Sequence, residues 1–113
     1  MHELGVVIEV VKTVEQFAKE NQVSVVDTVT LQIGELSAMI PRFIEECWPC
    51  AVDGTSLEQT KLTIEILRAH ARCSACGKVY PLIEHKDACP GCGGARKEIL
   101  NGREFMIKEI RAQ

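Results

Sequence analysis

The first regular pattern in the chain is a stripe of apolar residues close to its start. Five of the six residues from 6 to 11 are β-branched, which lowers helix propensity, so packing has to stabilise a helix in this segment. Apolar residues recur at mostly three-residue steps, the spacing of one face of an amphipathic α-helix over residues 4–19, with Asn21 as its expected end. The stripe consists of Leu4, Val7, Ile8, Val11, Val14, Phe17 and Ala18.

Three shorter segments alternate between apolar and polar residues, as half-buried β-strands do. They are residues 28–33, which Gly34 ends, residues 61–67, and a last strand over about residues 104–110. The alternating apolar positions are Val29, Leu31 and Ile33 in the first strand and Leu62, Ile64 and Ile66 in the second.

A second helix is predicted from Pro41, because proline is favoured in the first turn of a helix. Pro49 is expected to kink or end this helix, and Asp53-Gly54 is typical of a turn. Its buried side would hold Phe43, Ile44, Cys47 and Trp48.

The order of these elements predicts an α/β fold with a three-stranded sheet covered by two helices. Two cysteine pairs before the last strand add an inserted zinc-ribbon subdomain. Residues 1–70 and 94–113 would form a discontinuous core, and residues 71–93 would form the ribbon. Asn101-Gly102 predicts a type I′ β-hairpin that leads into the last strand, because both residues tolerate positive φ angles.

The ribbon is predicted from two Cys-x-x-Cys pairs, Cys73/Cys76 and Cys89/Cys92, which are separated by twelve residues and each followed by glycine. Tight turns of this kind point backbone N–H groups at the sulfurs, and two of them can present four thiolates to a tetrahedral Zn²⁺ ion. Four cysteines fill the coordination sphere, so the zinc would be structural. The alternatives are two disulfides or four unrelated thiols.

Composition and charge narrow the classes of function. The 113 residues are 46% hydrophobic, as in a globular domain, and no apolar stretch approaches the roughly 20 residues of a membrane span. The chain starts without a recognisable secretion signal, so we expect it in the cytoplasm, where paired cysteines favour metal over disulfides. The four charges between Cys73 and Cys92 cancel, which argues against nucleic acid as a partner.

The start of the chain, Met1-His2-Glu3, is a candidate site for a second metal. The Met1 amine, the deprotonated amide of His2 and its imidazole can close two chelate rings on one ion, and the amide or carboxylate of Glu3 can supply a fourth donor. Nitrogen donors in a plane suit Ni(II) or Cu(II) better than zinc. The alternative is a solvated terminus that binds no metal.

The chain resembles the HypA/HybF family of nickel metallochaperones over essentially its whole length. The resemblance rests on Met1-His2-Glu3-Leu4 before an amphipathic helix, on Leu31-Gln32-Ile33-Gly34-Glu35-Leu36, and on the two cysteine pairs. It implies a protein that delivers Ni(II) to the large subunit of a [NiFe]-hydrogenase, together with a maturation GTPase. The sequence contains no catalytic constellation, so we expect the protein to be non-enzymatic, and it leaves open whether the protein is a monomer or a homodimer. His2 would be the essential nickel ligand, helped by Met1 and Glu3, and the four cysteines would hold the structural zinc.

A third Cys-x-x-Cys pair, Cys47-Trp48-Pro49-Cys50, is not a feature that the resemblance leads us to expect. The two thiols could be small buried side chains, a further metal site, or the redox pair of a thiol–disulfide oxidoreductase. The oxidoreductase is the main alternative function. It lacks one usual support, because the residues from Pro41 onward put at least a helical turn before Cys47, away from the helix N-terminus.

Overall fold

The computed structural model describes residues 3–113 and contains the elements in the predicted order, helix, strand, helix, strand, ribbon, strand. Two compact units divide the chain. The core unit contains the chain up to Gln32, together with Met39–Glu65 and Phe105–Gln113. The ribbon unit contains Ile33–Ala38 and Ile66–Glu104. The ribbon unit therefore extends well beyond the predicted 71–93, because the strands that lead to and from the cysteines pack with it.

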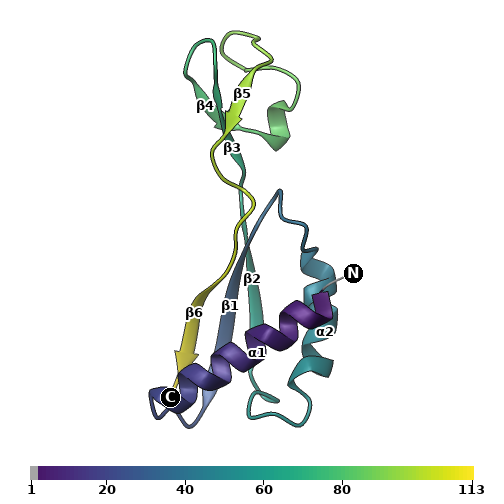
Figure 1. The fold of residues 1–113 in the computed structure, drawn as a ribbon, viewed down its shortest axis with the longest axis vertical. Helices are drawn as coiled ribbons and strands as arrows, with labels where there is room; N and C mark the ends of the chain where they lie inside the picture. The colour runs from purple at the N-terminus through teal and green to yellow at the C-terminus, as the bar shows by residue number, and fades with distance from the viewer. Residues whose placement is uncertain (1–2) are drawn as a thin grey trace. The chain divides into compact units, whose positions relative to one another are not determined.

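The core unit is a three-stranded sheet covered by two helices, as the sequence predicted (Figure 1). Strand β1 (Val26–Gly34) lies between β2 (Lys61–Leu67) and β6 (Phe105–Ala112). Helices α1 (Glu3–Glu20) and α2 (Pro41–Val52) pack against each other. Their apolar faces and the sheet share one hydrophobic core, which includes Val7, Val11, Val14, Val29, Leu31, Ile44, Trp48 and Val52.

Three polar side chains bridge the strands of this sheet. Gln32 on β1 donates to the Glu65 carboxylate on β2 over 3.3 Å, and Lys108 on β6 binds the same carboxylate at 2.8 Å. One face of the sheet thus packs on the helices while these side chains bridge the three strands, which is the usual division in a sheet with one solvated face.

Helix α2 continues three residues past Pro49 to Val52, so the proline does not end it. Pro49 is exposed, and water can therefore hydrogen-bond the backbone carbonyl that the missing N–H leaves open. Apolar burial at Ile44, Trp48 and Val52, one turn apart, holds this part of the helix in place. The Asp53-Gly54 turn is confirmed, with Gly54 at a φ of 75°.

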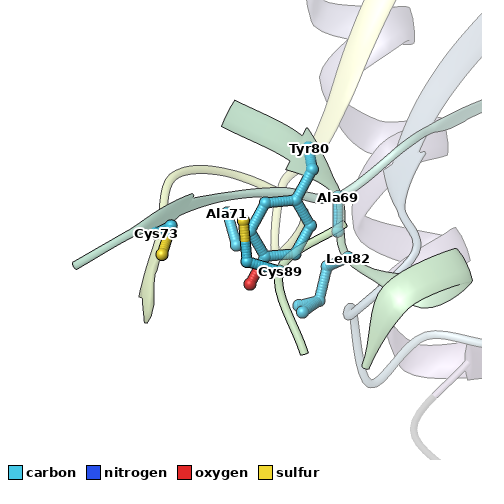
Figure 2. Close-up of a cluster of buried hydrophobic side chains, with 6 residues drawn as sticks. All are labelled: Ala69, Ala71, Cys73, Tyr80, Leu82 and Cys89. Atoms are coloured by element: carbon cyan, nitrogen blue, oxygen red, sulfur yellow. The ribbon is translucent and has the colours of Figure 1, made fainter. Parts of the chain in front are cut away.

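The ribbon unit contains a second small sheet. Strand β3 (His70–Cys73) pairs antiparallel with both β4 (Val79–Pro81) and β5 (Lys97–Ile99), and a single 3-10 turn, η1 (Ile83–His85), follows β4. Its buried cluster contains Ala69, Ala71, Cys73, Tyr80, Leu82 and Cys89, with the Tyr80 ring among the smaller side chains (Figure 2).

The predicted hairpin at Asn101-Gly102 is wrong, since β5 and β6 belong to different sheets. The Asn101 carboxamide instead accepts a hydrogen bond from the His70 backbone N–H at 2.8 Å and donates to the Arg68 carbonyl at 2.9 Å. Gly102 does have a positive φ, 121°, and its carbonyl accepts from the Leu36 N–H at 2.7 Å. The dipeptide therefore connects strands of two different sheets, because the Asn101 side chain bonds to the backbone of a distant segment.

Within residues 3–113, no helix combines the length and the apolar character needed to cross a membrane.

Candidate metal centre

The first cysteine pair lies at the end of β3, in the turn that leads to β4. The Ala75 backbone N–H donates to the Cys73 Sγ over 3.4 Å, and the Gly77 N–H donates to the Cys73 carbonyl at 2.9 Å. Gly77 has a φ of 78°, which a side chain would disfavour. The turn therefore has the form that the Cys-x-x-Cys-Gly sequence predicted.

The second pair repeats this geometry without any flanking strand. The Gly91 N–H donates to the Cys89 Sγ at 3.3 Å, the Gly93 N–H donates to the Cys89 carbonyl at 2.8 Å, and Gly93 also has a φ of 78°. The Cys89 N–H donates to the Gly94 carbonyl, as the Cys73 N–H does to Lys78. Two copies of one turn thus face each other with equivalent sulfurs.

The four sulfurs form one group, in which every Sγ lies within 4.8 Å of the others. The Sγ atoms of Cys73 and Cys92 are 3.5 Å apart, and those of Cys76 and Cys89 are 3.7 Å apart. A Zn–S distance of about 2.3 Å gives a tetrahedron whose edges measure about 3.8 Å. A disulfide would need about 2.05 Å, and all four thiols are free. The donor set fits a closed Cys₄ metal site.

The electrostatics of the cluster also favour a cation. Backbone N–H groups of Cys76 and Ala75 lower the pKa of Cys73 to about 6, which favours its thiolate. The Gly94 N–H acts to lower the pKa of Cys92, but the sulfurs of Cys73 and Cys76 outweigh it and raise that pKa to about 12. Four thiolates this close repel one another, and a divalent ion removes that repulsion.

The cluster is buried on one side only. Cys73 and Cys89 are 1% and 3% exposed, while Cys76 and Cys92 are exposed. Burial and the charge of the nearby cysteines raise the pKa of the Tyr80 hydroxyl, so this buried side chain stays uncharged beside the cluster. Among residues 3–113, these four cysteines are the one group of three or more His, Cys, Asp or Glu side chains that could hold an ion.

The candidate nickel ligands lie at the other end of the sequence. Met1 and His2 fall outside the residues that the structure describes. Glu3 is the first residue of α1 and is 4% exposed. An acidic residue in the first turn is favoured by the helix dipole.

The third cysteine pair lies within α2, seven and ten residues into the helix counted from Pro41. Cys50 is exposed and Cys47 is partly buried, so the interpretation of both thiols as buried core side chains is wrong for Cys50. Ile44, Trp48 and Val52 form the buried face instead. Cys47 is also away from the helix N-terminus, so the helix dipole does not activate it as it would in a thioredoxin-like redox pair.

Sequence reasoning missed the side chains that join the strands around the ribbon. The Glu35 carboxylate accepts from the Ala69 N–H at 2.6 Å, next to a close approach of the Gly34 and Gly102 backbones. A Cβ on Gly34 would overlap the Gly102 carbonyl. The Gly34-Glu35 dipeptide was visible in the sequence, but its role depends on two distant residues, Gly102 for Gly34 and Ala69 for Glu35.

An open apolar groove lies between α1 and β6, and none of the four cysteines lines it. It is lined mainly by apolar side chains and contains a single carboxylate, that of Glu9.

The model of the HypA family, described as hydrogenase/urease nickel incorporation metallochaperone, matches residues 1–112. The chain is 38% identical over 112 residues to hydrogenase maturation factor HypA of Streptomyces avermitilis, covering 97% of this chain and 86% of the relative. It is 34% identical to that of Geobacter metallireducens over the full length of both.

Two solved structures share the fold. The solution structure of the Ni metallochaperone HypA from Helicobacter pylori matches with a TM-score of 0.67 at 23% identity, covering 99% of this chain and 97% of the other. A second solution structure of a HypA protein matches with a TM-score of 0.73 at 23% identity, covering 100% and 97%. With a family match over almost the entire sequence, this chain belongs to the HypA family of nickel-incorporation metallochaperones, which are hydrogenase maturation factors.

Proposed function

We propose that this protein binds Ni(II) at its extreme N-terminus and delivers the ion to the large subunit of a [NiFe]-hydrogenase. The proposal is carried by the family match over residues 1–112, combined with a Met1-His2-Glu3 start that can chelate nickel. The ligands are the Met1 amine, the backbone amide and imidazole of His2, and a donor from Glu3.

In this proposal, nickel is cargo, and release to the acceptor requires that its ligands be exchangeable. A planar set of nitrogen donors at the end of the chain can exchange ligands without unfolding the core. The chain has no phosphate-binding P-loop, so the GTPase step belongs to a partner. The protein acts in the cytoplasm, as a monomer or a homodimer, without nucleic acid and without enzymatic activity of its own.

The four-cysteine site has a different task. We assign it to structural Zn(II) held by Cys73, Cys76, Cys89 and Cys92. Its support is the sulfur spacing, which fits a tetrahedral ion, and the full set of four thiolates, which leaves no open position for a substrate. When bound, zinc neutralises the thiolates and holds the two turns together, and the ribbon can then present a fixed surface to partners.

A nickel titration tests the N-terminal site. Native protein, protein with an N-terminal extension, and His2→Ala are compared, with zinc content as the internal control. Both changes are expected to abolish tight nickel binding while zinc stays stoichiometric, and acidification should weaken binding because the amine, amide and imidazole must lose protons. Glu3→Gln removes only the carboxylate and shows whether that group or the amide is the donor.

Equal nickel affinity in native, extended and His2→Ala protein would contradict the N-terminal site. Delivery is tested separately, by transfer of nickel from the loaded protein to the nickel-free large subunit. If nickel binds at the N-terminus but is not transferred to this acceptor, delivery is refuted. The proposed binding site is not affected by that result.

A further inference from the structure

Cys47 and Cys50 are the cysteines that the nickel and zinc sites leave unused. They lie three residues apart in α2, and side chains with this spacing are neighbours on the surface of a helix. Cys50 is exposed and Cys47 is partly buried, so both thiols border on solvent.

Packing does not explain this pair. Free cysteine is among the most buried residue types, and where it is exposed its chemistry usually matters more than its volume. The core face of α2 is complete without it, since Ile44, Trp48 and Val52 repeat at four-residue steps. Trp48 is additionally held by a 3.0 Å hydrogen bond from its indole N–H to the Thr60 carbonyl.

The helix geometry distinguishes a disulfide from a metal site. Cβ atoms three residues apart in a helix are about 5–6 Å from each other, whereas a disulfide needs about 3.5–4.5 Å. Closing the bond would therefore tighten a turn whose central residue, Trp48, is buried and hydrogen-bonded. A metal ion with bonds to sulfur of about 2.3 Å accepts sulfurs between about 3.8 and 4.6 Å apart, from tetrahedral to linear geometry. Side-chain rotation alone can supply that spacing.

The surroundings of the pair select the class of ion. Within residues 3–113, no His, Asp or Glu ligand atom joins these two sulfurs in a group of three or more. An ion that needs four protein ligands would therefore lack two of them at this pair. A soft ion that is satisfied by two thiolates fits the pair, and Cu(I) is the principal biological example of a thiolate-selective ion.

We propose that Cys47 and Cys50 form an additional metal site on α2, which binds a soft, thiophilic cation of the Cu(I) class through two thiolates. Binding is coordination without electron transfer, and each thiol releases its proton to solvent as its sulfur bonds to the ion. The site is independent of the nickel ligands and of the four-cysteine centre.

The test uses reduced, zinc-loaded, full-length protein without oxygen, with Cu(I) supplied from a chromogenic Cu(I) chelator. The wild type is compared with Cys47→Ser, Cys50→Ser and the double variant. We expect the wild type to take one more Cu(I) equivalent than the double variant, with zinc fully retained. Each single variant should lose as much binding as the double variant, because one remaining thiolate cannot chelate.

Two matched controls separate this site from its neighbours. Glu46→Gln changes an exposed carboxylate on the same helix and should leave the additional Cu(I) equivalent in place. His2→Ala should also leave it in place, since it removes only the proposed nickel ligand.

Three results would overturn the proposal. The double variant could bind as much Cu(I) as the wild type, or each single variant could lose only half of the additional binding, which would indicate two independent thiols. The third is rapid closure of a Cys47–Cys50 disulfide in the wild type on exposure to oxidised glutathione, with zinc retained and the helix intact. Closure would show that the turn tightens easily and would favour a redox pair.

Discussion

The core unit and the ribbon unit bury different kinds of side chain. The core unit buries large apolar residues from both helices and the sheet, among them seven valines at or below 6% exposure, along with Leu31, Ile44 and Trp48. The cluster of the ribbon unit has six members, of which two are alanines and two are metal-site cysteines. Tyr80 and Leu82 are its only large side chains.

This difference indicates two sources of folding free energy in one chain. Full burial of a large apolar side chain contributes about 1.5–3 kcal/mol, so the core unit can be stabilised by packing alone. The ribbon unit has too few such side chains to offset the entropy of ordering its turns. A structural zinc ion supplies about 10–16 kcal/mol in small metal-binding domains, which is enough to fold a unit of this kind.

The largest effect should follow from breaking the metal site. Cys89→Ser removes one of four thiolates, so we expect loss of stoichiometric zinc and of a large part of the roughly 10 kcal/mol that the metal supplies. Amide exchange should become fast in residues 66–104 and stay slow in α1, α2 and β1. Metal analysis and hydrogen exchange measure the two parts. A fully protected ribbon with bound zinc in this variant would contradict the four-cysteine assignment.

The reciprocal change breaks the core unit. Trp48→Ala removes a side chain that is 7% exposed and hydrogen-bonded to Thr60, and should destabilise the protein by about 3–5 kcal/mol. Chemical unfolding followed by circular dichroism measures this loss. Trp48→Phe is the control that keeps an aromatic ring and should cost clearly less. Zinc content should not change at low denaturant concentration. Zinc release that coincides with unfolding of the helices would argue against two separately stabilised units.

A pair of glycine variants compares a crowded position with an open one. Gly34→Ala places a methyl group against the Gly102 carbonyl and should destabilise by about 2–3 kcal/mol, since the backbone must move. Gly5→Ala has no atom within 4 Å of the new methyl group and lies in α1, so it should stabilise by about 0.5–1 kcal/mol. Thermal unfolding of the two variants should shift in opposite directions. Shifts of the same sign would contradict the close approach at Gly34.

The smallest effect is expected at the third cysteine pair. Because Cys50 is exposed and Cys47 lies beside the buried face, Cys47→Ala with Cys50→Ala should change the free energy of unfolding by less than about 0.5 kcal/mol in metal-free buffer. Denaturant titration under reducing conditions measures it. A loss of 2 kcal/mol or more would indicate that the thiols do pack in the core.

Much of the fold followed from local patterns. The three-residue apolar spacing predicted α1, the alternation predicted β2 with its bounds, and Pro41 marked the start of α2, because each of these signals depends on neighbouring residues alone. The four cysteines with their glycines likewise predicted a turn geometry that the structure contains twice.

The remaining features depended on partners far away in the sequence. Pro49 does not end α2 because apolar burial on both sides of it outweighs one missing hydrogen bond. Asn101-Gly102 forms no hairpin because the Asn101 side chain binds the backbone at Arg68 and His70, about 30 residues earlier.

The sequence by itself determined the elements of the core unit, the metal-binding turns and the family, since these are encoded in short motifs. Only the tertiary structure decided that β5 and β6 belong to different sheets, how far the ribbon unit extends, and that Cys50 is exposed on α2. The physical reason is that burial and hydrogen-bond satisfaction are set by the whole chain, and local spacing carries no information about which distant segment will provide them.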